Sequence, residues 1–160
     1  MHNSAIEQML KGGAEVGQCL TFLLFKHLYA VPILTVQEIR RYSAPTPLPN
    51  APSYVLGLIN LRGNVIPVFD LRLRFGQAAP TYDRQTVIII AKVDERHVGV
   101  VADDVVKVLA MNREAVRPPP PLAAHIDTSF VQCLLRDGDV IVTLFDVNKL
   151  LRPELETLDV

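Results

Sequence analysis

Two side chains of opposite charge stand in otherwise apolar surroundings. Arg62 lies within LGLINLRGNVIPVFDL (56–71), beside a Gly-Asn pair. Its planar guanidinium binds carboxylates through paired hydrogen bonds and suits interfaces better than lysine. Glu38 is a candidate partner, because Val36 and Ile39 flank it in an otherwise apolar context. Two alternatives remain open for Arg62: a solvated charge beside a turn, or a positioned contact to a carboxylate of this chain or of another protein.

The residue types that usually carry catalysis or bind metals are scattered. None of the four histidines pairs with a Cys or a carboxylate at zinc-ligand spacing: His2, His27, His97 and His125. Asp103-Asp104 is an acidic pair in a predicted strand, where successive side chains point to opposite faces. Nucleophile-elbow, dinucleotide-binding and phosphate-loop motifs are absent from the sequence. The sequence therefore predicts no enzyme activity, no metal and no cofactor.

The bulk composition limits the classes of partner. The chain has 160 residues, 49% of them hydrophobic, and its formal net charge is −1. Nucleic-acid binding normally requires a basic excess, so no nucleic-acid partner is predicted. The N-terminus lacks the pattern of a secretory signal, and no apolar run approaches the roughly 18 residues of a membrane helix. We expect a cytoplasmic protein without membrane insertion. Cys19 and Cys133 are expected to be buried free thiols, with a disulfide as the alternative.

The elements that position these residues are predicted to be short strands. Hairpin turns are expected at Phe25-Lys26-His27, at Gly63-Asn64 as a two-residue loop with Gly first, and at Asp137-Gly138-Asp139. The segment TVQEIRRY (35–42) is either a single helical turn or an irregular strand. Asp70 is predicted to begin a short helix that ends at Gly76, and Asp146 a second one that stops before Pro153.

Proline-rich stretches and an internal echo indicate the domain organisation. Four prolines in SAPTPLPNAP predict an extended surface connection, and a second proline run occupies 118–121. GNVIPVFDL (63–71) and GDVIVTLFDV (138–147) share a turn glycine, an apolar strand and a Phe-Asp helix start. The echo indicates two similar β-units, with chance similarity between hairpins as the alternative. We expect an all-β fold of two small barrels around one shared core.

At this point the sequence resembles a known family. YAVPILTVQEIRRY, PTPLPNAPSYVLGLINLRGNVIPVFDLRLRFG, VGVVADDV and VIVTLFDVNKLL are similar, in this order, to the CheW family of chemotaxis coupling proteins. The resemblance runs from about residue 20 to 151. It implies two intertwined five-stranded SH3-like β-barrels with short helices and a shared hydrophobic core. We therefore divide the chain into a tail (1–17), a CheW-like domain (18–151) and a C-terminal tail (152–160).

The resemblance also implies a function and a set of site residues. It implies a non-enzymatic adaptor that couples the cytoplasmic tips of methyl-accepting chemoreceptors to the regulatory domain of the histidine kinase CheA. Further copies of the adaptor are implied as partners in array rings beneath the membrane. The implied receptor- or kinase-binding residues are Val36, Glu38, Ile39, Gly57, Asn60, Leu61, Arg62, Gly63 and Gly99. For Gly57 and Gly99, a tight contact inside the barrel is the alternative.

Three functional alternatives follow. The first is the adaptor of flagellar chemotaxis, and the second is an adaptor of the same fold in pilus-based motility or surface sensing. The third, from another class, is a small β-barrel enzyme or ligand-binding protein, which would need convergent titratable groups in a pocket. One departure from the family is the bulky Phe25-Lys26-His27 turn, which predicts either a different turn geometry or an exposed aromatic contact.

Overall fold

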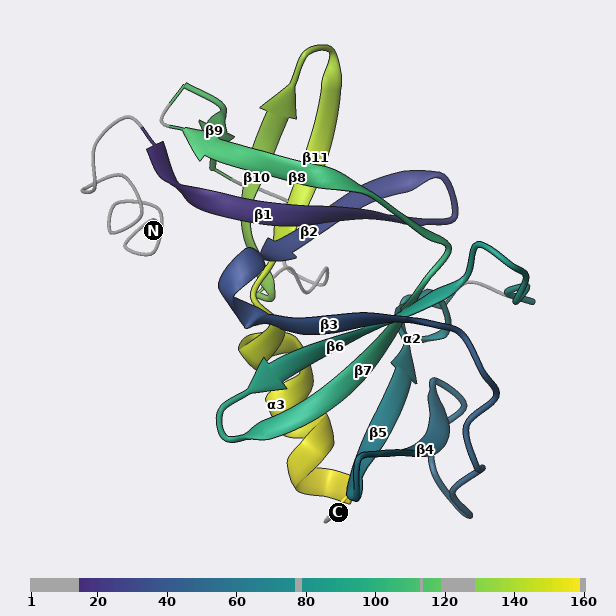
Figure 1. Cartoon of the computed structure of the whole chain (residues 1–160). Helices are drawn as coiled ribbons and strands as arrows, with labels where there is room; N and C mark the ends of the chain where they lie inside the picture. The colour runs from purple at the N-terminus through teal and green to yellow at the C-terminus, as the bar shows by residue number, and fades with distance from the viewer. Residues whose placement is uncertain (1–14, 77–78, 113, 119–128, 159–160) are drawn as a thin grey trace.

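Short apolar segments bounded by turns form the strands of two β-sheets, which are the upper and lower bodies in Figure 1. The structure is a computed structural model that describes residues 15–76, 79–112, 114–118 and 129–158. The second proline run (118–121) lies almost wholly outside the described residues. The two sheets are two SH3-like β-barrels, so the predicted all-β class is confirmed.

The first barrel has the strand order β8-β1-β2-β11-β10-β9. Its strands are β1 (Glu15–Leu24), β2 (His27–Pro32), β8 (Asp104–Asn112), β9 (Val116–Arg117), β10 (Val131–Asp137) and β11 (Val140–Phe145). All neighbours are antiparallel except β11 and β2, which run parallel. The two-residue β9 adds a short sixth strand to the five that were predicted.

The second barrel has the strand order β3-β6-β7-β5-β4. Its strands are β3 (Val36–Arg41), β4 (Val55–Leu61), β5 (Asn64–Asp70), β6 (Val87–Val93) and β7 (Arg96–Ala102). Here β5 and β7 are the parallel pair. The ambiguous segment around Glu38 is an irregular strand, because β3 has a register shift between Val36 and Glu38.

The two barrels exchange strands. The chain leaves β2 through a 3-10 turn, η1 (Ile33–Thr35), and its next strand, β3, pairs with β6 of the second barrel. It leaves β7 and returns as β8 to pair with β1 of the first barrel. β5 and β11 hold the same fourth place in the two strand orders, so the sequence echo corresponds to equivalent strands. The predicted intertwining is confirmed.

Buried apolar side chains form three clusters. The largest joins both barrels and includes Phe22 of β1, Phe69 of β5, Ile89 of β6 and Phe145 of β11. Two smaller clusters fill the individual barrels. Burial of these side chains supplies the main driving force for holding the barrels together. The predicted shared core is confirmed.

Asp residues begin both helices, as predicted. The Asp70 carboxylate accepts from the Arg72 backbone N–H at the start of α2 (Leu71–Arg74), and Gly76 follows with φ of 83°. The Asp146 carboxylate accepts from the Lys149 backbone N–H at the start of α3 (Val147–Leu158). Figure 1 shows α3 descending from the junction of the barrels along the second one.

Two predicted boundaries are wrong. α3 continues through Pro153 to Leu158, so 152–158 is helix and not a tail. Proline removes one intrahelical hydrogen bond, but Leu151 and Leu155 on the buried face hold the helix in the shared core. At the other end, β1 begins at Glu15, inside the predicted tail, because Glu15 pairs with Asn112 of β8.

Candidate functional site

The turn that carries Arg62 differs by one residue from the predicted loop. Leu61 and Asn64 form the last pair of the β4–β5 ladder, so the two loop residues are Arg62 and Gly63. Both have positive φ, 50° and 88°, which is typical of a type I′ turn. The Asn60 side-chain oxygen accepts from the Gly63 N–H at 2.9 Å and fixes the turn. Arg62 is therefore held at the turn's first central position.

Arg62 pairs with Glu38, the candidate partner named from the sequence. Nη2 of Arg62 lies 2.5 Å from Oε1 of Glu38, and the Arg62 side chain is 72% exposed. β3 and β4 are the two ends of the strand order, so this ion pair crosses the gap between them, which we call the seam of the second barrel. A backbone bridge between Thr46 and Leu58 crosses the same seam. An exposed pair of this kind contributes little to stability.

The apolar residues of the implied site differ in how far they are exposed. Ile39 is exposed, whereas Val36 is half-buried and packs against the shared core. Leu61 is only 8% exposed and belongs to the core of the second barrel. Leu61, one of the implied site residues, therefore offers no apolar surface, because β4 turns its side chain inward. Val65 at the start of β5 is an exposed apolar residue that the sequence analysis did not select.

The two predicted strand glycines are buried and are approached from within the barrel. A Cβ on Gly57, whose φ is 143°, would lie 2.0 Å from the backbone oxygen of Thr46. A Cβ on Gly99 would lie 2.8 Å from a methyl group of Ile88. These neighbours account for both glycines without an external partner, and favour the internal contact that was left open.

A buried ionic cluster lies at the junction of the two barrels, and the sequence analysis did not identify it. Arg72 donates from Nε and Nη2 to the two carboxylate oxygens of Asp70 at 3.0 and 2.8 Å, and both side chains are fully buried. Its Nη1 reaches Oδ1 of Asp103 at 2.5 Å. Asp103 stands between β7 and β8, where the chain returns to the first barrel. The cluster therefore joins the second barrel to the crossover.

The same cluster explains the unusual first hairpin turn. Phe25 and Lys26 form a two-residue turn with φ of 50° and 74°. The Phe25 N–H donates to Oδ2 of Asp103 at 2.6 Å, and the ring lies 5.7 Å from the Arg72 guanidinium. Phe25 thus contacts the second barrel and is only half-exposed. The sequence marked Phe25 as an unusually bulky turn residue, but it did not indicate the partner, Asp103, which lies 78 residues away.

Tyr82 also belongs to the cluster, where it contacts both Asp70 and Arg72. Its hydroxyl donates to Oδ2 of Asp70 at 2.7 Å, its ring lies 5.1 Å from the Arg72 guanidinium, and it stacks on Tyr42. Burial, followed by the hydrogen bond and charge of Asp70, raises the pKa of Tyr82. Burial opposes the charge of Arg72, but hydrogen bonding and the charges of Asp70 and Asp103 outweigh it and raise the pKa of Arg72. Arg72 therefore stays charged at the centre of the cluster.

The described residues contain no group of three or more His, Cys, Asp or Glu side chains suited to a metal ion. His27 is exposed at the start of β2, and His97 lies within β7. Both histidines are therefore strand residues and lie outside the two-residue loops of their hairpins. Cys19 and Cys133 are buried free thiols, which confirms the first of the two predicted alternatives. Within the same described ranges, no helix is long and apolar enough to span a bilayer.

Comparison with known proteins agrees with this architecture. The CheW-like domain family matches residues 18–154. The chain is 40% identical to the chemotaxis protein CheW of Klebsiella aerogenes over 143 residues, covering 89% of this chain and 86% of the relative. It is 33% identical to the chemotaxis protein CheW of Rhizobium meliloti, covering 94% and 96% of the two chains.

A solved structure shows the same fold. The scaffolding protein TtCheW from Thermoanaerobacter tengcongensis superposes with a TM-score of 0.75 at 30% identity, covering 84% of this chain and 90% of that one. The matches support a role as a scaffolding adaptor in chemotaxis. The chain belongs to the CheW-like domain family.

Proposed function

We propose that this protein is a non-enzymatic adaptor that couples the cytoplasmic tips of methyl-accepting chemoreceptors to the regulatory domain of the histidine kinase CheA. It acts in the cytoplasm, at receptor arrays that it joins through these partners and through further copies of itself. The observation that carries the proposal is the exposed Glu38–Arg62 pair on the seam of the second barrel. Its residues are those that the family resemblance assigns to the receptor surface.

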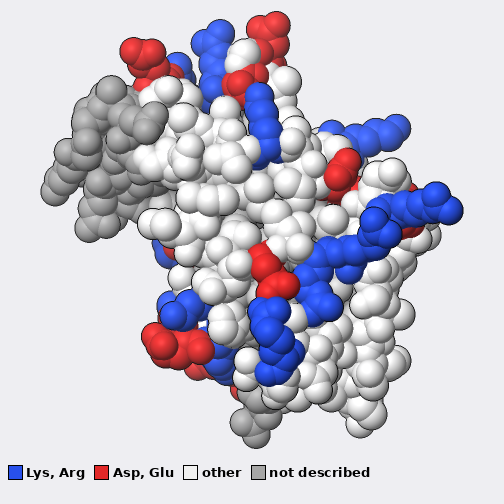
Figure 2. Space-filling model, in the orientation of Figure 1, with Lys and Arg blue, Asp and Glu red and all other residues white. Residues whose placement is uncertain are grey.

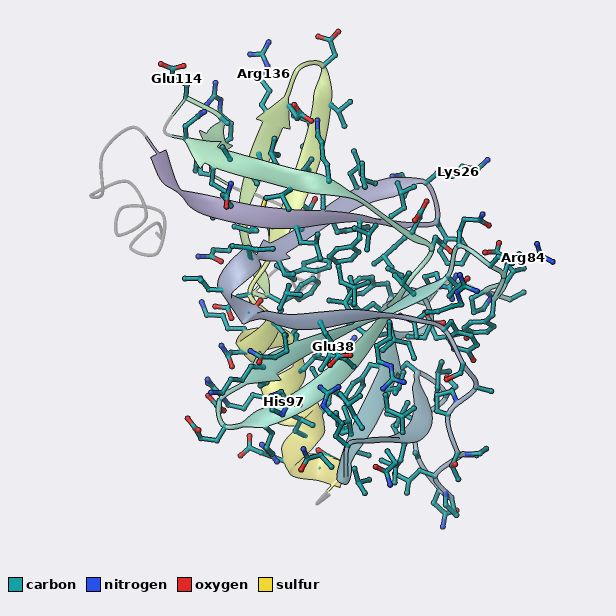
Figure 3. All side chains as sticks on the ribbon, in the orientation of Figure 1. Lys26, Glu38, Arg84, His97, Glu114 and Arg136 are labelled. Carbon is teal, nitrogen blue, oxygen red and sulfur yellow. The ribbon has the colours of Figure 1, made fainter. Side chains whose placement is uncertain are left out.

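The seam suits the docking of a helical hairpin. Val65, close to the turn that carries Arg62, is 57% exposed and can contact the apolar face of a helix. Ile39 is 44% exposed, but it lies on the opposite face of β3 from Glu38. Glu38 and Arg62 then fix its orientation, because charged groups at an interface set register and specificity more than affinity. Figure 3 shows Glu38 on the face of the second barrel, well away from Arg136 at the tip of the first.

The kinase is proposed to contact a separate surface. The tip of the β10–β11 hairpin, in the first barrel, exposes Val140 and Ile141 at 45% and 52%. Exposed apolar side chains at a barrel end can contribute to a protein contact. Two separate surfaces allow one molecule to hold both partners, and many modest contacts acting together stabilise an array.

The test is a binding titration with the receptor cytoplasmic fragment and the CheA regulatory domain of the same genome. Arg62→Glu places two acidic groups against each other at the seam, so we expect weaker receptor binding with unchanged kinase binding. Arg136→Glu, at the far hairpin, is the matched control and should leave receptor binding unchanged. Far-UV circular dichroism and thermal melting establish that both variants are folded. Unchanged receptor affinity in folded Arg62→Glu would contradict the proposed receptor site.

A further inference from the structure

An open groove of about 230 Å³ lies along the seam of the second barrel. Arg40 and Ser43 line one side of it, and Leu58 and Asn60 of β4 line the other. Along the chain, these residues fall between the Thr46–Leu58 bridge at one end of the seam and the Glu38–Arg62 pair at the other. The groove therefore continues the surface that is proposed to receive the receptor.

Arg40 has no acidic partner among the described residues. Four arginines of the described residues each pair with a carboxylate, namely Arg62, Arg72, Arg74 and Arg152, whereas Arg40, like Arg41 and Arg84, does not. No hydrogen bond or ion pair is found for the Arg40 side chain among the described residues, although it is half-buried. Its guanidinium carries five N–H donors, which remain accessible to water in the groove and are free to meet an acceptor on a partner. Arg40 thus holds unused donors in a groove beside an interface.

The surrounding charge and chemistry favour an anionic group. Figure 2 shows basic side chains gathered around an acidic group on this face of the second barrel. Asn60 uses its side-chain oxygen within the turn, so its amide N–H groups remain as donors, and the Ser43 hydroxyl adds another. A guanidinium with amide and hydroxyl donors is the usual environment of a bound carboxylate.

We propose that Arg40 binds a carboxylate side chain on the same partner helix that contacts Glu38 and Arg62. This inference rests on the proposed function and adds the chemistry of the partner: a helical segment with an acidic residue beside its apolar face. A phosphate surface is less favoured, because nucleic acids and membranes require extended basic surfaces, whereas this chain has a net charge of −1.

Neighbouring arginines provide a matched pair of variants. Arg40 lines the groove, whereas Arg41 follows it in β3, points to the opposite face of the strand and does not line the groove. Arg40→Gln and Arg41→Gln remove the same charge within one residue of each other. A specific carboxylate contact predicts a difference between them, whereas diffuse attraction predicts none.

The experiment is calorimetric titration of the full chain with the receptor cytoplasmic fragment at two salt concentrations. We expect Arg40→Gln to weaken binding about fivefold to tenfold and to reduce its salt dependence, with Arg41→Gln close to wild type. Arg40→Lys should recover part of the affinity, since it keeps the charge but loses the fork.

Several results would overturn the inference. If folded Arg40→Gln binds like wild type while Arg62→Glu binds weakly, the carboxylate contact is wrong and the proposed function stands. Equal weakening by Arg40→Gln and Arg41→Gln would indicate diffuse attraction instead. Sedimentation with phosphatidylserine vesicles that depends on Arg40 would assign the groove to lipid. If wild type does not bind the receptor fragment at all, both proposals fail.

Discussion

Arg72 of the second barrel contacts Asp103 at the crossover to the first barrel, with 2.5 Å between Nη1 and Oδ1. Asp103 accepts in turn from the Phe25 N–H in the first hairpin. A chain of charge-assisted hydrogen bonds thus connects elements that the strand exchange brings together. Such bonds are among the stronger polar interactions in proteins, and burial makes them costly to break.

Arg72→Met should strongly destabilise the protein. It leaves the buried Asp70 carboxylate without its paired donors, and breaking a buried pair in this way costs about 3–5 kcal/mol of unfolding free energy. Urea unfolding followed by circular dichroism measures the change. Arg62→Met, which breaks the exposed pair with Glu38, is the control and should cost no more than about 1 kcal/mol. Equal effects of the two variants would show that the cluster does not hold the barrels together.

Gly63→Val should destabilise the β4–β5 hairpin. No atom lies within 4 Å of an added Cβ, so the cost comes from the backbone, whose φ of 88° disfavours a β-branched residue. We expect a loss of about 1–3 kcal/mol. Gly63→Asn should lose less, because asparagine tolerates positive φ. A melting temperature unchanged in Gly63→Val would mean that the turn is not type I′ in solution.

These turns show what local sequence can and cannot determine. A glycine beside Arg62 predicts a two-residue loop, but not its register, since type I′ and II′ turns place glycine at different positions. The register follows from the Leu61–Asn64 pair, and hence from the partner strand. Likewise, the Asp70 helix start was predictable from adjacent residues, whereas the pairing of Arg72 with Asp103, 31 residues away, depends on the strand exchange.

The C-terminal helix shows the same limit. Pro153 is a strong local signal for a helix end, which is why the helix was predicted to stop before it. Burial of Leu155 beyond the proline, at 2% exposure, outweighs the lost hydrogen bond. By contrast, the sequence indicated Glu38 as a candidate partner of Arg62, but a solvated arginine remained open as the alternative. The seam of the second barrel brings the two side chains together.

Leu155→Ala should therefore destabilise the whole domain. Truncating a buried leucine costs about 2–5 kcal/mol when the cavity cannot collapse. The neighbouring Glu156 is exposed, so Glu156→Ala is the control and should stay within about 0.5 kcal/mol of wild type. Thermal melting measures both. If Leu155→Ala melts like the control, the helix beyond Pro153 does not pack on the core.

The two thiols should resist modification in the folded protein. Burial raises the pKa of Cys19 to about 11 and, together with the neighbouring Cys19, that of Cys133 to about 12. Thiolate is the reactive form, so Ellman's reagent at pH 8 should label both cysteines only after denaturation. Rapid labelling of the native protein would contradict their burial.

The same pKa shifts predict alkaline destabilisation. The unfolded thiols ionise near about pH 8.5, whereas the folded ones remain protonated to higher pH. Their contribution to stability is complete below the unfolded pKa and is lost as pH rises through the folded values. The free energy of unfolding should fall less steeply above pH 8.5 in the Cys19→Ala/Cys133→Ala variant, which provides the control.

The most direct test of the adaptor role is a three-component titration of the wild-type chain. The CheA regulatory domain of the same genome is titrated first, and the receptor cytoplasmic fragment is then added to the complex. The proposed function predicts that both bind and that the second does not displace the first. Failure of a folded sample to bind either partner would contradict it, and displacement of one partner by the other would rule out two separate surfaces.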